Sequence, residues 1–124
     1  MASERQYDVN LYKDENLRFR LHNYKWVAGV KNDDLIADLT NVIVKVYDNN
    51  IVPSTAVITS TMLINPTHIV HAGAYVTVDV PCDSLAYGVE YWYDIQYTKT
   101  GASESIYVKG GKLTKTYKLD RNVA

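Results

Sequence analysis

Two histidines and the single cysteine are the side chains of this sequence most often used in metal and nucleophile chemistry. His68 and His71 lie three positions apart, and Cys82 and Asp83 follow eleven and twelve positions after His71. Imidazole, thiolate and carboxylate groups are zinc ligands, so these four side chains could form a metal site if the fold brought them together. Pro66 and the nearby valines favour loop or strand, where positions i and i+3 point to opposite faces. We therefore expect a polar loop, no metal site and no metal cofactor.

Hydrolysis would need an activated nucleophile or a pair of carboxylates. Cys82 has no adjacent base or cation that would activate its thiol, which favours a small apolar turn residue. Asp79, Glu90 and Asp94 alternate with apolar residues, as solvent-facing strand residues do, which argues against a glycosidase pair. The sequence contains no P-loop, dinucleotide fingerprint, nucleophile elbow or EF-hand loop. We therefore predict no enzymatic activity, no catalytic residues and no cofactor.

The composition indicates the kind of fold that positions these residues. The chain has 124 residues, enough for one domain, and contains 15 Val, 8 Ile, 10 Thr, 11 Tyr, 2 Trp and 1 Phe. β-branched and aromatic side chains suit a pleated surface and lose rotamer freedom in helices. The composition therefore predicts an all-β domain, and the one cysteine excludes an internal disulfide.

Alternation of apolar and polar residues predicts seven or eight short strands. In one of them Val42, Val44 and Val46 share a face, and in another Tyr91 begins the most aromatic alternation of the chain. Turns are expected at 31–34, 48–50 and 99–103. This spacing is typical of an antiparallel β-sandwich. The expected strands are 17–21, 24–30, 41–48, 55–64, 75–80, 89–98, 106–108 and 113–118.

The first fifteen residues form a polar N-terminal arm, followed by the sandwich at 16–119 and a tail at 120–124. The arm has only four apolar anchors: Tyr7, Val9, Leu11 and Tyr12. Four buried side chains return roughly 6–12 kcal/mol, whereas ordering fifteen residues costs about 15–30 kcal/mol of backbone entropy. We therefore expect an arm that is mobile in the isolated chain. Two interpretations stay open: a frayed terminus, or a partner-binding arm whose Val9 and Leu11 add a strand to a neighbour's sheet.

Aromatic side chains are more numerous than a small core requires. Trp26, Tyr87, Trp92, Tyr93 and Tyr97 are all candidates for a contact surface, because Tyr and Trp combine large buried area with a polar group. Trp26 and Trp92 are predicted as partner-binding residues. The alternative is a sugar-stacking platform, as in a carbohydrate-binding or adhesin module.

Charge and hydropathy exclude several classes of partner. The formal net charge is -1, which argues against binding to nucleic acid or to acidic membranes through bulk charge. The longest uncharged stretch, 49–78, is interrupted by prolines and histidines, and no signal peptide is expected at the N-terminus. Residues 99–124 carry +4 and the rest of the chain -5. This asymmetry indicates either an edge strand protected by lysines or docking between unlike faces of subunits, including copies of this chain.

The segment from Leu85 to Tyr91 opens the most aromatic strand. Its leucine, then Gly88 three positions later and Tyr91 three after that, resemble the tyrosine corner of immunoglobulin-like and fibronectin type III sandwiches. In that corner the phenol bonds back to the backbone. We therefore predict structural roles for Leu85, Gly88 and Tyr91.

A longer resemblance covers about residues 16–118. Asp38-Leu39-Thr40-Asn41-Val42 and Gly110-Gly111-Lys112-Leu113-Thr114 resemble the strand openings of immunoglobulin-like domains in tailed-bacteriophage virion proteins, such as the N-terminal domain of the baseplate upper protein. The resemblance implies a structural protein located in the virion. It implies capsid decoration through contacts with capsid, neck or tail subunits, or alternatively a place in the baseplate, neck or tail.

Overall fold

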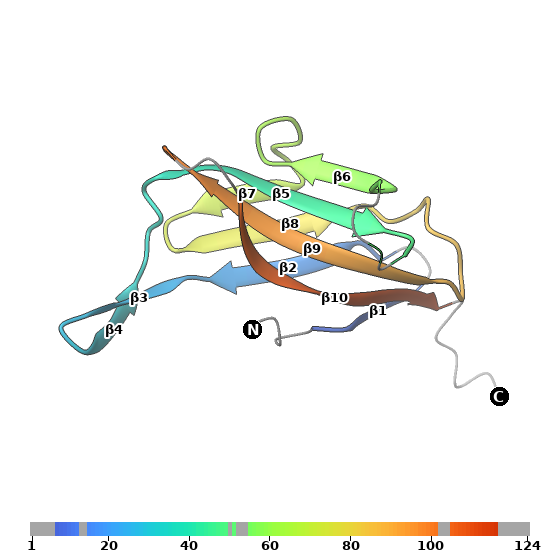
Figure 1. The fold of residues 1–124 in the computed structure, drawn as a ribbon, viewed down its shortest axis with the longest axis horizontal. Coiled ribbons are helices and arrows are strands. Elements are labelled where there is room, and N and C mark those ends of the chain that lie inside the picture. The colour runs from blue at the N-terminus through green and yellow to red at the C-terminus, as the bar shows by residue number, and fades with distance from the viewer. Residues whose placement is uncertain (1–6, 13–14, 50, 52–54, 102–104, 117–124) are drawn as a thin grey trace.

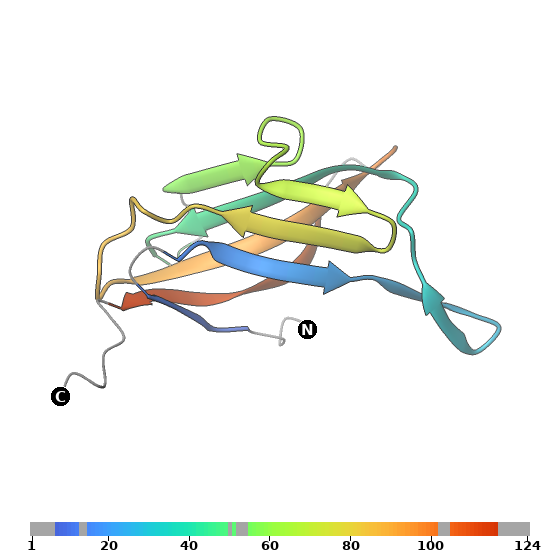
Figure 2. The same cartoon turned by 180° about the vertical axis from the view of Figure 1, so that it is seen from behind.

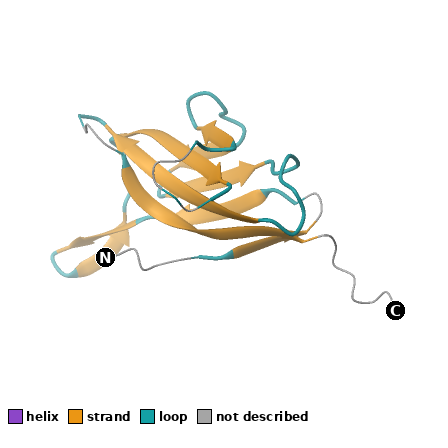
Figure 3. Cartoon of the chain, turned by 45° about the vertical axis from the view of Figure 1, so that its right-hand side comes forward, coloured by secondary structure: helices purple, strands orange, loops and turns teal. Residues whose placement is uncertain are grey.

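The computed structural model describes residues 7–12, 15–49, 51, 55–101 and 105–116. All the regular secondary structure in these residues is β-strand (Figure 3). Ten strands occur in them: β1 Val9–Tyr12, β2 Leu17–His22, β3 Tyr24–Val27, β4 Val30–Asp33, β5 Leu39–Tyr47, β6 Ile58–Thr61, β7 Ile69–Ala72, β8 Tyr75–Val80, β9 Glu90–Lys99 and β10 Ile106–Thr116. The prediction of an all-β chain is therefore confirmed.

Two sheets pack face to face, and a third projects from them (Figure 1). The larger sheet has the order β1-β10-β9-β5-β6, and the smaller has the order β2-β8-β7. Neighbouring strands are antiparallel except β1 and β10, which are parallel. The third sheet is the β3–β4 hairpin, which extends beyond one end of the other two (Figure 2).

The core lies between the two larger sheets and follows the alternation in the sequence. Val42, Val44 and Val46 of β5 are fully buried, as are the three valines of β8. Tyr91 and the three inward-facing residues that follow it on β9 extend the wall that β5 forms, opposite the valines of β8. Because strand side chains alternate between faces, the polar residues between these positions lie on the outer faces, as predicted.

Several expectations about the strands were wrong. The polar loop expected around His68 and His71 is in part a strand, because β7 covers Ile69–Ala72, and the strand expected at 24–30 ends at Val27. Residues 31–34 were expected to form a turn, but residues 30–33 form β4 and the turn lies at Ala28 and Gly29, whose φ values are 52° and 81°. Two consecutive positive φ values are what a tight hairpin turn requires. The expected strand at 55–64 is only four residues long, because the Asn65 N–H donates to the Thr61 carbonyl and the Thr61 N–H donates to Asn65 Oδ1, which turns the chain. The last two expected strands are one strand, β10.

The arm also differs from the prediction. Val9–Tyr12 pairs with this chain's own β10 rather than with a neighbour's sheet, and Leu11 is only 4% exposed. The ladder continues upstream, where Tyr7 N–H donates to the Gly110 carbonyl at 2.8 Å. The arm docks because its backbone hydrogen bonds to β10 of the same chain add to the burial of its side chains. Residues 1–6, 13–14 and 117–124 lie outside the described residues, including the expected tail.

Candidate functional site

The histidines and the cysteine are placed apart by the structure. His68 Nδ1 lies 3.0 Å from Ser60 Oγ, while His71 Nε2 lies 3.0 Å from the carbonyls of Leu35 and Gly73. Cys82 is fully buried, and burial raises the pKa of its thiol. No group of three or more His, Cys, Asp or Glu side chains suited to a metal ion occurs in the part of the chain that the structure describes.

The three candidate carboxylates lie on two different sheets. Asp79 is on β8, where it accepts from Asn16 Nδ2 at 2.8 Å and from Arg18 Nε at 3.1 Å. Glu90 and Asp94 are on β9, four residues apart and so roughly 13 Å apart along the strand. That separation exceeds the spacing of either kind of glycosidase pair. The arrangement therefore supplies no acid–base pair.

Lys115 is a buried charge that the sequence analysis missed. It is 3% exposed, and its Nζ donates to the carbonyls of Cys82 and Asp83 at 3.0 and 3.3 Å. Its Nζ also lies 5.0 Å from the centre of the Tyr87 ring. The sequence does contain a sign of this burial, because Lys115 lies two positions after the apolar Leu113 and therefore on the same face of the strand. The side chain ties the loop after β8 to β10.

The tyrosine of the predicted corner makes the predicted hydrogen bond. Tyr91 Oη accepts from the Ala86 N–H at 2.9 Å. Leu85 is buried as well, and Gly88 has a φ of 76°, a conformation that glycine adopts without strain. The Gly88 N–H donates to the Lys115 carbonyl at 2.9 Å, so the corner is also fixed to β10.

The β3–β4 hairpin carries several large exposed apolar side chains. All eight of its strand residues are exposed, and Trp26, one of the predicted partner-binding residues, is 69% exposed. Tyr24, Val27 and Val30 are exposed as well. Large apolar side chains that gather on a projecting element mark interaction sites.

Asn23 fixes the base of this hairpin. Its backbone N–H donates to the Ala74 carbonyl, and its own carbonyl accepts from the Asp34 N–H. Its side-chain amide donates to the carbonyls of Leu21 and Ala74, and its Oδ1 accepts from Tyr97 Oη at 2.9 Å. The start of the hairpin is therefore held by Asn23, all of whose polar groups have hydrogen-bond partners. No local pattern in the sequence indicates this role.

A stack of rings and cations continues from the base along one face of the hairpin. The His22 ring lies between Tyr75 and Tyr24, with centroid separations of 4.3 and 4.1 Å. His22 Nε2 is 2.9 Å from Asp33 Oδ1, and Tyr24 Oη is 2.7 Å from His22 Nδ1. Arg20 covers the Tyr75 ring. Lys31 covers Tyr24, so Trp26 is the aromatic side chain of the hairpin left most exposed.

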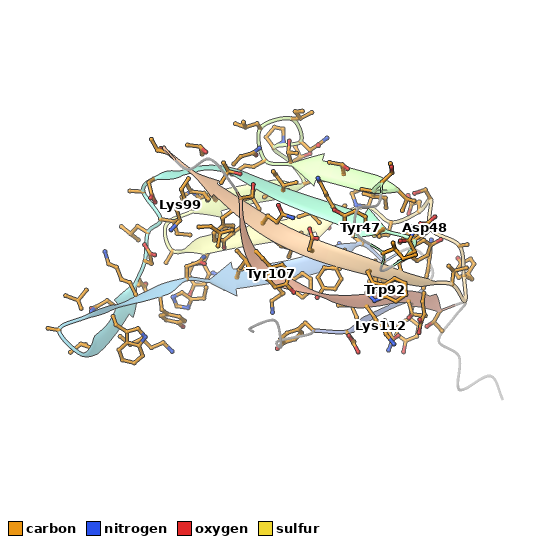
Figure 4. All side chains as sticks on the ribbon, viewed as in Figure 1. Tyr47, Asp48, Trp92, Lys99, Tyr107 and Lys112 are labelled. Carbon is orange, nitrogen blue, oxygen red and sulfur yellow. The ribbon has the colours of Figure 1, made fainter. Side chains whose placement is uncertain are left out.

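The other predicted partner-binding residues lie elsewhere. Leu11 is buried and Val9 packs against the core, so neither is available to a partner while β1 is in place. Tyr12 is half-buried, and Tyr7 is exposed but has its ring under Lys109 Nζ at 3.5 Å. Trp92 lies on the outer face of the five-stranded sheet, between Tyr47 and Lys112 (Figure 4).

Comparison with known proteins does not assign a function to these surfaces. Among the described residues, no helix reaches the length and apolarity that crossing a membrane requires. No protein-family model matches this sequence, and no curated protein or solved structure matches it either. What the chain does must therefore be inferred from its own side chains and strand order.

Proposed function

We propose that this chain is a non-enzymatic structural protein of a tailed-phage virion, where it decorates the capsid through protein–protein contacts. The resemblance of residues 38–42 and 110–114 to phage immunoglobulin-like domains supports this origin. The strand order supports an immunoglobulin-like fold, because β2-β8-β7 and β10-β9-β5 correspond to strands B-E-D and G-F-C of that fold.

An aromatic pair occupies the place of the conserved disulfide in antibody domains. In those domains the second cysteine follows the corner tyrosine by two residues, which here is the position of Tyr93. Tyr93 stacks on Phe19 of β2, with ring centroids 5.5 Å apart and planes 27° apart. The stacked pair places a non-covalent contact between the two sheets where those domains have a covalent link. This correspondence further supports the immunoglobulin-like assignment.

The observation that carries the binding proposal is the exposed hairpin. It lies in the connection between β2 and β5, the B–C connection, which forms a recognition loop in antibody variable domains. The β9–β10 loop lies at the same end, where Thr100 N–H donates to the Asp38 carbonyl at 2.8 Å. Because Asn23 and the His22 stack hold the hairpin in place, binding would require little loss of conformational freedom.

The tip of the hairpin defines the chemistry of its partner. Trp26, Val27 and Val30 are apolar, whereas Lys25 and Lys31 beside them are exposed and positive. We infer that the tip enters an apolar pocket of a virion subunit whose rim carries carboxylates. A capsid subunit is the first candidate, and a neck, tail or baseplate subunit or a second copy of the chain would use the same contact.

The proposal is tested on purified particles of the source phage. Mass spectrometry should detect the chain in the particles, and Trp26→Ala should lower its incorporation by about tenfold or more, as for an aromatic hot spot. Leu63→Ala is the matched control, because Leu63 is also 69% exposed but lies on another loop. Absence of the chain from the particles, or equal incorporation of both variants, would overturn the proposal.

A further inference from the structure

The outer face of the five-stranded sheet carries a second group of aromatic and polar side chains. Pairing aligns Tyr47 of β5 with Trp92 of β9, and Trp92 with Lys112 of β10. In the next row, Lys45 pairs with Asp94. Figure 4 shows Tyr47, Trp92 and Lys112 in a row across three strands, with Tyr107 farther along β10. Residues paired in this way have Cβ atoms about 5 Å apart, so they form one continuous surface.

A glycine allows an aromatic ring to enter this surface. Gly110 pairs with Asp94 and has no side chain, and the Tyr107 ring lies over it. A Cβ atom added at Gly110 would be 2.6 Å from Tyr107 Oη and 3.0 Å from its Cε1. A side chain at this position would therefore collide with the Tyr107 ring and with the Tyr93 carbonyl oxygen, which would lie 2.7 Å from the added Cβ atom. Even so placed, Tyr107 is 48% exposed and keeps a face open to a ligand.

Asp94 lies at the centre of the group. It accepts from Gln96 Nε2 at 3.1 Å and is half-buried. Burial raises the pKa of its carboxyl. Burial also raises the pKa of both Tyr47 and Tyr107, and the Asp94 charge adds to that rise as a second, smaller cause. Two phenols and one carboxylate therefore converge on a small area of the sheet.

The balance of charge on this face points to the class of ligand. Lys45 faces Asp94, and Lys112 Nζ lies 3.6 Å from Glu90 Oε2. Neither an anion nor a cation would find an excess of opposite charge here. The face offers hydrogen-bond donors, acceptors and flat aromatic rings together. A neutral carbohydrate matches this set, because its hydroxyl groups both donate and accept and its C–H faces are apolar.

We propose that this outer face, formed by Tyr47, Trp92, Asp94, Gln96 and Tyr107, binds a neutral oligosaccharide. The rings stack against sugar faces, and Asp94 and Gln96 bond to hydroxyl groups. The β3–β4 hairpin is less suited to this role. Its Tyr24 ring is already covered by Lys31, so it offers one free ring and not a platform. The site is separate from the hairpin contact, so it does not rest on the proposed virion function.

The test uses the full chain on an array of neutral, acidic and amino-sugar oligosaccharides, followed by NMR titration with neutral tetrasaccharides from the array. We expect binding to neutral glycans, with shifts at Trp92 and Asp94. Trp92→Ala should weaken it about tenfold or more, whereas Trp92→Phe, which keeps a ring, and Trp26→Ala should bind within about twofold. Asp94→Asn keeps the shape of the surface and should weaken binding through the lost carboxylate.

Several results would overturn this assignment. They are the absence of binding to any neutral glycan at millimolar concentration, binding to acidic glycans alone, or an equal loss of binding in Trp26→Ala. Thermal melts of each variant show whether the fold is retained. Because incorporation into particles is measured separately, failure here leaves the hairpin contact standing, and failure of the hairpin contact leaves this site standing.

Discussion

The β9 strand and the β3–β4 hairpin are both antiparallel and rich in aromatic residues, yet they place those residues in opposite environments. Tyr91, Tyr93 and Tyr97 of β9 are buried between two sheets, whereas Tyr24 and Trp26 of the hairpin are exposed. The difference lies in what covers each strand. β9 has a neighbour on both sides and a second sheet facing it, while the hairpin has neither. A strand's alternation thus reports burial only where another layer is present to bury it.

The two regions should differ most in the free energy of unfolding that is lost when one side chain is removed from each. Ile95 of β9 is fully buried, so Ile95→Ala should cost about 2–5 kcal/mol of unfolding free energy. Trp26→Ala removes more atoms from an exposed position and should change stability by only about 0.5 kcal/mol. Urea unfolding of both variants measures this. Equal losses would mean that the hairpin tip packs against the sandwich.

A second prediction concerns the edge of the larger sheet. A Cβ atom at Gly111 would lie within van der Waals overlap of the Tyr7 carbonyl, so Gly111→Ala should displace the start of the β1 ladder. Overpacking of this kind costs about 1–3 kcal/mol. Hydrogen exchange should become faster in β1, including at Leu11, and stay unchanged in the hairpin. Unchanged exchange in β1 would show that the arm does not dock as described.

Two of the three buried tyrosines of β9, Tyr91 and Tyr97, allow effects on the core to be distinguished from effects on the hairpin. Tyr91→Phe leaves the Ala86 N–H without its acceptor and should cost roughly 1–3 kcal/mol. Tyr97→Phe releases Asn23 Oδ1, so it should also speed exchange of the Asp34 amide at the hairpin base. Tyr91→Phe is the control for that local effect. If both variants speed Asp34 exchange equally, Tyr97 does not anchor the hairpin.

The core could be predicted from the sequence because its signal is local. Val42, Val44 and Val46 each follow the two-residue period, and Tyr91 follows a recognisable turn. Long-range pairings gave no such signal. The parallel docking of β1 depends on Gly110 and Gly111, which lie about a hundred residues away and read as a break between strands.

The candidate surfaces were only partly predictable for the same reason. Trp26 and Trp92 stand out by residue type, and the structure places both at the surface. Asn23 acts through hydrogen bonds with Ala74 and Tyr97, and no sequence pattern around Asn23 predicts these long-range partners. Asp94 read as an ordinary solvent-facing carboxylate, because its neighbours Tyr47 and Tyr107 come from other strands.

The smallest expected effect compares two aspartates, one on the outer face of each sheet. Hydrogen bonds from Asn16 and Arg18 lower the pKa of Asp79, so its ionised form favours the folded state. That contribution is present above the ordinary aspartate pKa of about 3.9 and is lost as pH falls through the lowered value. Burial raises the pKa of Asp94, so its ionised form disfavours the folded state. The stability that the protonated Asp94 carboxyl contributes is present below about pH 3.9. It is lost as pH rises through the raised pKa.

The two asparagine variants should therefore shift stability in opposite directions. At about pH 7, Asp79→Asn should lower the urea midpoint and Asp94→Asn should raise it. At about pH 3, where both carboxyls in the unfolded chain are largely protonated, both differences should shrink. Because the Asp79 side chain is 42% exposed to solvent, its effect should be small and should weaken further with added salt. A lower midpoint for Asp94→Asn at neutral pH would mean that Lys45 and Gln96 outweigh burial. Asp94 would then act as a structural partner of those two side chains, and its carboxylate would be less free to accept from a sugar hydroxyl.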